Sequence, residues 1–460
     1  MTFQRILSPA ISIFVILLGL VGLRSAAALP AFPEAQGWGT ETPGGRNGKV
    51  MFVTSLADKG AGTLREALLT KGARTILFRV GGIIRLEQPL RMSGPDYSFA
   101  TIAGQSAPGG GIAITGSDFI LNNGLHDIVF RHVRFRACGE GPTVHSNCRN
   151  VVFDHCSFSW AADENLDIYV DTTDVTISHC IFAEGLINGD HVKGAGHSCG
   201  LLVGKGVDRV SMHRNFFTGN SARNPLLLGG NLKKWRDAHV LHPSFDVRNN
   251  LIYNARGGHL HIMAGPLVNV VGNVFVHGPD SIPHIAEIGL PDLNDEETTT
   301  EGTKVFVADN IGPHLKNGDP WSIIYDEPHH VWGPRPEMYR TEKPIPAPPV
   351  TTASSKDVPR LVLEQAGALP HDETDQRLIR EFREGKGTAG APDRRRDTPF
   401  PPPAPGTPAP DRDNDGMTDA WETQHQLDPA SAADCWTDPD KDGYSNLEEF
   451  LNGTNPRRTE

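Results

Sequence analysis

Acidic residues near the C-terminus recur at spacings that suit metal coordination. Residues 411–449 contain 12 acidic and 2 basic side chains. Two twelve-residue loops in this range carry side-chain oxygens at positions 1, 3, 5, 9 and 12, a glycine at the sharp turn and a backbone carbonyl at position 7. Such a shell of hard oxygens suits Ca²⁺, so two calcium loops are predicted rather than a solvated acidic tail. The predicted ligands are Asp411, Asp413, Asp415, Met417, Asp419 and Glu422 in the first loop, and Asp438, Asp440, Asp442, Tyr444, Asn446 and Glu449 in the second.

A second set of polar residues lies in the middle of the chain. Asp163 and Asp167 are separated by three residues, and Lys193 and Arg223 follow. By itself an Asp-x-x-x-Asp pair is more often a turn than a metal site. Single basic side chains are usually solvated. The chemistry of this set therefore depends on the elements that position it.

Those elements are short apolar segments that recur along the chain. Seven of them begin at residues 128, 151, 175, 210, 245, 268 and 305, with a base period near 23 residues that is interrupted by insertions. Such a period without helical patterning predicts a solenoid, a parallel β-helix with coils about 4.8 Å apart. A β-sandwich, the alternative, repeats every 8–12 residues or so. Four segments carry asparagine at the sixth position, which predicts an internal amide ladder: Asn215, Asn250, Asn273 and Asn310.

The repeat also bears on Asp154 and His155, which could form an acid–base pair. Because Asp154-His155 occupies a repeated position in its coil, we expect packing and hydrogen bonding within the coil instead. Cys156 and Cys180 occupy equivalent positions in two coils. Buried thiols or a disulfide are both compatible with that placement, and the pairing of the six cysteines is left open.

Four motifs follow one another along this repeat. They are Phe153-Asp154-His155 with Asp163-Glu164-Asn165-Leu166-Asp167-Ile168, His191-Val192-Lys193 with Leu202-Val203-Gly204, Arg214-Asn215 with Arg223-Asn224-Pro225, and Asn249-Asn250-Leu251-Ile252-Tyr253-Asn254. In this order they resemble the motifs of the pectate lyases of polysaccharide lyase family one, over roughly residues 30–390. The resemblance implies an all-β chain built as a right-handed parallel β-helix.

The resemblance also implies roles for individual side chains. Asp163 and Asp167 would hold a Ca²⁺ that bridges to the substrate carboxylate, with Glu140 as a further ligand from a rough alignment. Lys193 would bind the substrate carboxylate. Arg223 would bind substrate and remove the C5 proton. Because arginine is ordinarily protonated, this role requires a depressed pKa and predicts an alkaline optimum.

The function implied is a secreted, calcium-dependent pectate lyase. It would cleave de-esterified pectin (polygalacturonate) by β-elimination to 4,5-unsaturated oligogalacturonates. Two positions depart from the family pattern, Leu228 where a second arginine is frequent and Glu164 where glycine follows the first aspartate. The alternatives are a lyase for another uronate polymer and a non-catalytic, calcium-stabilised polysaccharide-binding or adhesive β-helix. A polygalacturonase would need clustered aspartates and a Gly-His-Gly stretch, which the sequence lacks.

The composition and the N-terminal sequence limit the cellular compartment and the classes of partner that are compatible with this chain. With 49 glycines, 36 prolines and 7% aromatic residues, the chain favours turn-rich β structure, and its net charge of -12 argues against nucleic acid as a partner. Arg5, the apolar stretch 10–23 and Ala26-Ala27-Ala28 predict a secretory signal peptide. We therefore expect a secreted, extracellular monomer without a membrane anchor after cleavage, with the periplasm or the cell surface as alternative locations.

The same patterns divide the chain into segments. A short helix is expected at 62–69, where it could cap the open end of the stack, and further helices at 358–368 and 372–387. The calcium module resembles dockerin-like, EF-hand and thrombospondin type 3-like modules, for which a cell-surface or other extracellular partner is an option. The expected segments are a signal peptide (1–28), the β-helix lyase domain (29–345), a helical extension (346–390), a proline-rich linker (391–410) and the calcium-loop module (411–456).

Overall fold

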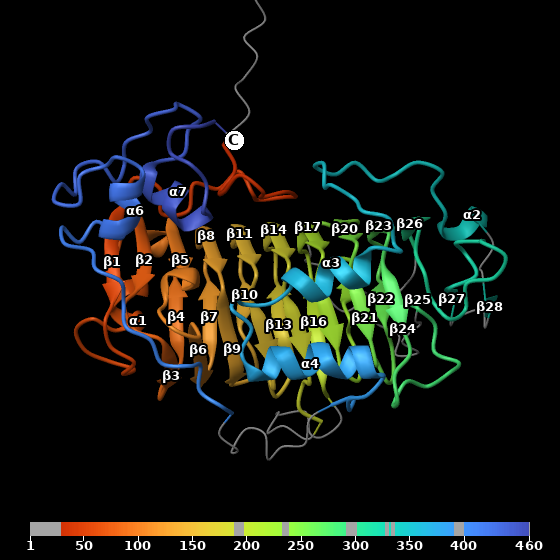
Figure 1. Ribbon diagram of the computed structural model, residues 1–460. Coiled ribbons are helices and arrows are strands. Elements are labelled where there is room, and N and C mark those ends of the chain that lie inside the picture. The colour runs from red at the N-terminus through yellow and green to blue at the C-terminus, as the bar shows by residue number, and fades with distance from the viewer. Residues whose placement is uncertain are drawn as a thin grey trace, which may run out of the picture.

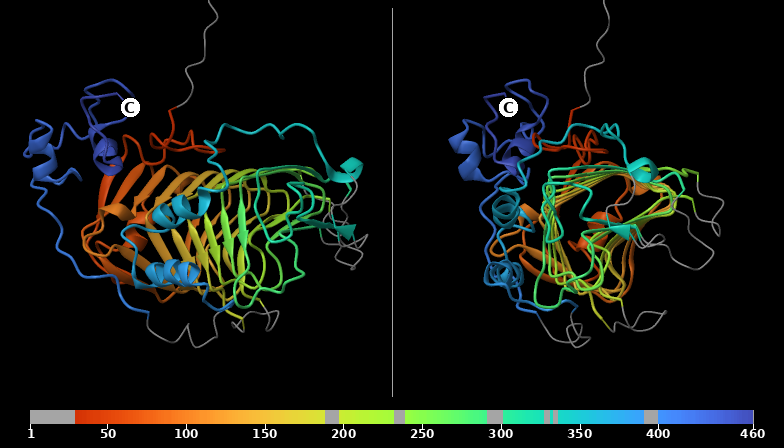
Figure 2. Two further views of the ribbon diagram at one scale, coloured as in Figure 1. Left: turned by 45° about the vertical axis from the view of Figure 1, so that its right-hand side comes forward. Right: turned by 90° about the vertical axis from the view of Figure 1, so that its right-hand side faces the viewer.

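Three parallel sheets wind around one core in the computed structural model (Figure 1). The structure describes residues 29–187, 197–231, 239–290, 301–326, 331–332, 336–390 and 400–459. Figure 2 shows the stack of coils obliquely and along its axis. The predicted right-handed parallel β-helix is confirmed.

Successive coils contribute strands to three sheets in turn. The first sheet contains β1 (Lys49–Val53), β2 (Arg74–Phe78), β5 (Ala100–Ala103), β8 (His126–Arg131), β11 (Arg149–Asp154), β14 (Thr173–Ser178), β17 (Asp208–His213), β20 (Ser244–Arg248), β23 (Leu267–Val271) and β26 (Lys304–Ala308). The second sheet contains β4 (Leu90–Ser93), β7 (Phe119–Asn122), β10 (Thr143–His145), β13 (Glu164–Tyr169), β16 (Cys199–Gly204), β19 (Leu226–Leu228), β22 (Leu260–Met263), β25 (Ile288–Leu290), β27 (Ile324–Asp326) and the antiparallel β28 (Val331–Trp332). The third sheet contains β3 (Gly82–Leu86), β6 (Ile112–Gly116), β9 (Val133–Cys138), β12 (Ser157–Ser159), β15 (Ile181–Ala183), β18 (Phe216–Thr218), β21 (Leu251–Tyr253) and β24 (Val274–Val276).

The register of the strands places residues of the same type next to one another in successive coils. Phe158 lies between Phe135 and Phe182, with ring centroids 5.2 and 5.0 Å away and nearly parallel planes. The predicted asparagine ladder is confirmed. Nδ2 of each asparagine donates to Oδ1 of the next, at 2.9 Å from Asn215 to Asn250, 2.9 Å from Asn250 to Asn273 and 3.0 Å from Asn273 to Asn310. These buried amides satisfy one another, so they cost little in the core.

Asp154 and His155 have the packing role expected from the repeat. His155 stacks on His132 and His179 at 4.9 and 4.6 Å between ring centroids. The Asp154 carboxylate lies 2.8 Å from Nδ1 of His155 and 3.3 Å from Nδ1 of His179, and it accepts a hydrogen bond from Ser178. All six cysteines lie in the described residues and are buried, and Cys156 and Cys180 form no disulfide with each other.

Helices close the stack and cover one face of it. The predicted N-terminal helix is α1 (Leu64–Leu68), which buries Leu64, Ala67 and Leu68 at the end of the first coils. The helices predicted near the C-terminal side are α3 (Val358–Gln365) and α4 (Glu373–Glu384), which lie side by side on the third sheet (Figures 1 and 2). The remaining helical segments are η1 (Pro95–Tyr97), η2 (Gly104–Ser106), α2 (Pro336–Tyr339), α6 (Asp419–Gln424) and α7 (Asn446–Asn452). None of the helices in the described residues is long and apolar enough to cross a bilayer.

A buried charge network fastens α4 to the sheet. Arg136 is fully buried, and its Nη2 lies 2.6 Å from Asp375 and 3.1 Å from Asp372. Asp372 also caps α4 by accepting the N–H of Asp375. These paired charges hold the helical extension against the coils that carry the polar residues described next.

Candidate functional site

The first part of the site is a bulge at the start of β13. The N–H of Asp163 donates to the carbonyl of Glu140 at 3.3 Å, and the N–H of Asp167 donates to that of Pro142 at 3.0 Å. The interval of four residues from Asp163 to Asp167 therefore lies alongside an interval of only two residues, Glu140 to Pro142, in the preceding coil. Extra residues of this kind bend a strand and redirect its side chains.

Arg223 reaches the same place from two coils further along. Its backbone has a φ of 58°, and its carbonyl accepts the N–H of Leu201 at 2.8 Å, which anchors it beside β16. Nη1 contacts the carboxylate of Glu164 and lies 3.8 Å from Oδ1 of Asp163. Burial lowers the pKa of Arg223, and the charge of Asp163 opposes that shift. Lowering this pKa favours the neutral guanidine that a base would need.

Three more side chains surround this cluster. Ligand atoms of Asp163, Glu164 and Cys199 lie within 4.8 Å of one another. His197 places Nε2 3.7 Å from Oδ1 of Asp163. The pKa of His261 is lowered to about 4 by burial and by the charge of Arg223. His261 is therefore neutral near pH 7, and Arg223 supplies the local positive charge.

The structure brings some of the predicted residues together and leaves others apart. Glu140 lies in the coil directly below Asp163 with an exposed side chain. Asp167 is close in the chain but is not a member of the compact group formed by Asp163, Glu164 and Cys199. Lys193 lies outside the described residues. Leu228, at the position of the family's second arginine, packs with Leu226 and Met263 in a small apolar cluster.

Sequence reasoning missed the part played by Glu164, which it noted only as a departure from the family glycine. Glu164 is the first residue of β13 and pairs in register with Cys199 of β16. Its carboxylate is 4% exposed and faces Arg223. Carboxylates on adjacent coils are the donor type that Ca²⁺ prefers, whereas the thiol of Cys199 is not. The carboxylates of Asp163 and Glu164 therefore fit a calcium ion by donor type, and Asp167 and Glu140 stay predicted ligands.

The C-terminal loops have the backbone arrangement expected of calcium loops. Oδ2 of Asp411 accepts the N–H of Gly416 at 3.1 Å, and Oδ2 of Asp438 accepts that of Gly443 at 2.9 Å. Both glycines have φ values near 100°, at 103° and 105°. Only glycine adopts this conformation readily, so the turn at the sixth position is built as the spacing requires.

The first loop gathers carboxylates that need a counter-charge. Asp415, Glu422 and Asp434 place oxygens within 4.8 Å of one another. Glu422 is fully buried, and neither of its carboxylate oxygens has a hydrogen-bond partner. Burial, with repulsion from neighbouring carboxylates, raises the pKa of Asp415 to about 7 and that of Glu422 to about 8. Buried acids in this state fit a cation.

Two predicted loop residues make hydrogen bonds within the module, and one unpredicted residue takes part. Oδ1 of Asp419 accepts the N–H of Arg412 at 2.9 Å, and Asp419 is not in the compact groups. The side-chain amide of Asn446 donates to the carbonyl of Asp434 at 2.9 Å. Asp434 lies between the two loops in the sequence, so the loop spacing gave no signal for it.

A parallel β-helix that carries clustered carboxylates and a part-buried arginine on one sheet has the features of a polysaccharide lyase. Over 458 residues the chain is 31% identical to probable pectate lyase C of Aspergillus flavus, covering 94% of this chain and 96% of that protein. It is 30% identical to the Emericella nidulans protein of the same name over 460 residues, with 96% of each covered. The chain belongs to the pectate lyase family.

Two further comparisons describe its parts. A solved pectate lyase from Paenibacillus sp. 0602 has 13% sequence identity and a TM-score of 0.48, over 75% of this chain and 98% of that one. Residues 411–432 match the bacterial TSP3 repeat. The thrombospondin type 3-like resemblance of the C-terminal module is thereby confirmed.

Proposed function

We propose that this pectate lyase acts on de-esterified polygalacturonate by calcium-dependent β-elimination. The observation that supports this most is the convergence of Asp163 and Glu164, which are neighbours in one coil, with Arg223 from two coils further along. A lyase of this kind removes the C5 proton beside a uronate carboxylate and expels the C4 oxygen, leaving a 4,5-unsaturated sugar.

Asp163 and Asp167 would hold the ion, with Glu140 as a further ligand. A Ca²⁺ held there would neutralise the substrate carboxylate and stabilise the enolate-like charge that develops on it. Arg223 takes the C5 proton in its neutral form, which burial favours by lowering its pKa. Because the neutral form becomes more populated as pH rises, activity should rise toward alkaline pH. Lys193 would bind the substrate carboxylate.

Glu164 adds a constraint on the base. An anionic carboxylate in contact with Arg223 stabilises its protonated form. Proton transfer therefore requires that this contact loosen when substrate and metal occupy the site. Glu164 holds the guanidinium in place between turnovers and keeps it beside Asp163.

We further propose that residues 1–28 direct secretion and that the mature enzyme comprises the β-helix (29–345), its helical extension (346–390), a linker (391–410) and a calcium-loop module (411–456). The apolar stretch and small residues near the N-terminus support export. The proposed ions of the module are held by residues from both twelve-residue loops and by Asp434. We expect a monomer whose substrate is polygalacturonate.

The direct test is the ultraviolet absorbance of unsaturated uronate formed from polygalacturonate at alkaline pH, first with calcium and then with a chelator. Absorbance that appears with calcium and disappears with chelator is the expected result. New reducing ends without absorbance would mean hydrolysis and would refute elimination. Absorbance with alginate or another uronate polymer, but not with polygalacturonate, would redirect the substrate assignment.

A further inference from the structure

The C-terminal module packs against the β-helix, and it does so through its calcium loops. Figure 1 places α6 and α7 beside β1, β2 and β5 at one end of the first sheet. Met417 and Leu447 of the module are fully buried, in one apolar cluster with Leu77 and Ala103 of β2 and β5. A Cβ on Gly416 would lie 2.5 Å from Cδ1 of Leu77. The sharp turn of the first loop therefore touches the sheet directly.

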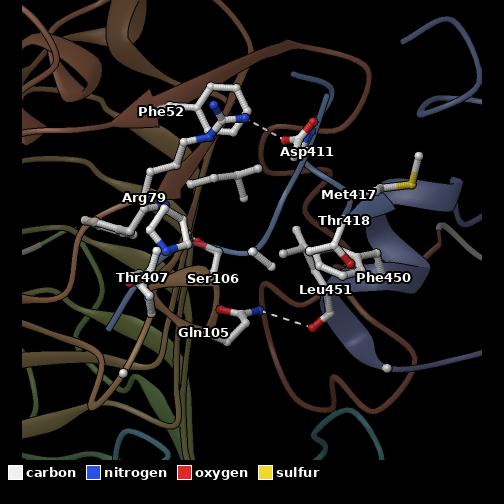
Figure 3. A pocket seen from close by; sticks show the side chains of 18 of the residues that line it. Phe52, Arg79, Gln105, Ser106, Thr407, Asp411, Met417, Thr418, Phe450 and Leu451 are labelled. Carbon is white, nitrogen blue, oxygen red and sulfur yellow. Dashed lines mark hydrogen bonds and ion pairs between the residues drawn. The ribbon is translucent and has the colours of Figure 1, made fainter. Parts of the chain in front are cut away.

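Charged side chains of the β-helix meet the same loops. Nη2 of Arg79 lies 2.7 Å from Oδ2 of Asp411, and its Nη1 donates to Asn414 at 2.7 Å. The Arg79 guanidinium stacks 3.8 Å from the ring centroid of Phe52 (Figure 3). Asp411 is also the first residue of the first calcium loop, and its other oxygen accepts the N–H of Asp415. One carboxylate thus serves both the loop and the interface.

The contacts span four neighbouring strands of the first sheet. Arg46, before β1, pairs with Glu448 at 2.6 Å. Gln105, after β5, donates to the carbonyl of Leu451 at 3.4 Å (Figure 3), and Arg131, at the end of β8, donates to Asn452 at 2.6 Å. The module is strongly acidic, and the sheet presents arginines to it. The charges are complementary at two places in this contact, Arg46 with Glu448 and Arg79 with Asp411.

The linker reinforces this docking. The N–H of Gly110 donates to the carbonyl of Ala404 at 2.8 Å, so residues 400–410 run along the β-helix. Linker, module and sheet together line an open pocket of about 550 Å³, and its lining includes Phe52, Arg79, Gln105 and Phe450 (Figure 3).

We propose that the module is an intramolecular calcium-dependent clamp on the N-terminal coils of the β-helix, and that Asp434 helps to hold its first ion. Asp411, Gly416 and Met417 belong to the loop and to the interface at once. When calcium orders the loop, it therefore also orders the docking surface, and its binding free energy favours docking. By linkage, docking must in turn raise the affinity of the loop for calcium. This inference rests on the calcium loops proposed above and is independent of the lyase site.

The metal side of the proposal rests on buried, unsatisfied oxygens. Asp415 is 2% exposed, and its Oδ2 has no hydrogen-bond partner. Both oxygens of Glu422 are in the same state, and Oδ1 of Asp434 is also buried without one. These atoms converge on one point. A cation there removes the repulsion between three carboxylates, which otherwise opposes the loop conformation that docks.

Hydrogen exchange of the full chain tests the clamp. β1 is the edge strand of the first sheet, so its amides report whether the module covers that end. Calcium should raise their protection on the order of tenfold relative to chelator. The double variant Glu422→Gln with Asp434→Asn should remove this increase, and Glu364→Gln, an exposed acid on α3, should keep it. Equal protection of β1 in calcium and in chelator would overturn the proposal.

Calcium titration calorimetry on the full chain tests the reciprocal effect. Arg79→Ala should weaken calcium binding by the module on the order of tenfold. Arg209→Ala removes a surface pair with Asp174 elsewhere on the first sheet and should leave it unchanged. An unchanged affinity in Arg79→Ala would refute the coupling. Cleavage of polygalacturonate by the same proteins reports on the lyase site separately, so the failure of one proposal is distinguishable from the failure of the other.

Discussion

The two acidic regions of this protein are built in opposite ways. In the C-terminal module, a twelve-residue loop supplies most of the oxygens around each point, and backbone N–H groups of the same loop orient them. At the lyase site, Asp163 and Arg223 are 60 residues apart in the sequence and meet only because their coils stack. A local loop keeps its chemistry when it is moved to another protein. An assembled site depends on the register of the whole solenoid.

This difference predicts different responses to damage. Loss of Asp163 or Arg223 at the assembled site should remove catalysis and leave the core intact, because both residues are only partly buried. Loss of a calcium-binding side chain in the module should lower the stability of the N-terminal coils. The predictions that follow separate these two effects.

Arg223→Ala should have the largest effect on activity. Removal of a proton-transferring group lowers rates by about 10²–10⁴-fold. Initial rates of unsaturated-product formation at saturating calcium would measure this loss, and Arg209→Ala, which removes an exposed arginine of the first sheet, is the matched control. Rates within a few-fold of the unmodified protein would exclude Arg223 as the base.

Asp163→Asn and Glu422→Gln together test whether the two regions are separate. Asp163→Asn should lower kcat/KM on the order of 100-fold, since it weakens charge stabilisation at the reacting centre. Glu422→Gln should mainly lower the calcium-dependent rise in Tm. Rates and thermal melting would be measured for both variants over a calcium titration. A large loss of rate in Glu422→Gln at saturating calcium would show that the regions are coupled.

Glu164→Gln should shift the pH profile without abolishing activity. The anionic carboxylate favours protonated Arg223, so removing its charge lowers the pKa of that arginine. The neutral form then appears at lower pH, and the alkaline rise in kcat/KM should move down by about one pH unit. Profiles for Glu164→Gln and for Glu87→Gln, a surface control, would be compared. A shift of the profile to higher pH would contradict the effect assigned to the contact between Glu164 and Arg223.

Leu228→Arg should have the smallest effect. It places a cation in the apolar cluster beside Met263, at the position where the family pattern has a second arginine. We expect KM for polygalacturonate to fall a few-fold with little change in kcat, because the added charge acts on binding. Leu228→Met keeps the size without the charge and should leave KM unchanged. An equal change in both variants would point to packing rather than charge.

Much of the fold was predictable because its signals are periodic. The asparagines at the sixth repeat position specified a ladder, and Asn215, Asn250 and Asn273 form it as expected. Helices at 358–368 and 372–387 were also predictable from their patterns, and α3 and α4 occupy those ranges. Such features depend on residues whose spacing in the chain is regular, so a sequence displays them directly.

The contacts of the candidate site were less predictable. The pairing of Glu164 with Arg223 depends on insertions that set how far each coil extends before its strand begins. Likewise, Asp434 joins Asp415 and Glu422 because α6 and the following turn fold back, which no spacing rule describes. The family resemblance pointed to Asp163 and Arg223 but to neither of these partners.

By itself, the sequence determined the repeat, the amide ladder and the two glycine-turned acidic loops, because each is encoded by residues at short or regular separations. Only the tertiary structure decided that Glu164 faces Arg223, that burial lowers the pKa of that arginine, and that the acidic module rests on β1, β2 and β5. These outcomes depend on desolvation and on contacts between distant segments. Both are properties of the packed molecule and of no single stretch of chain.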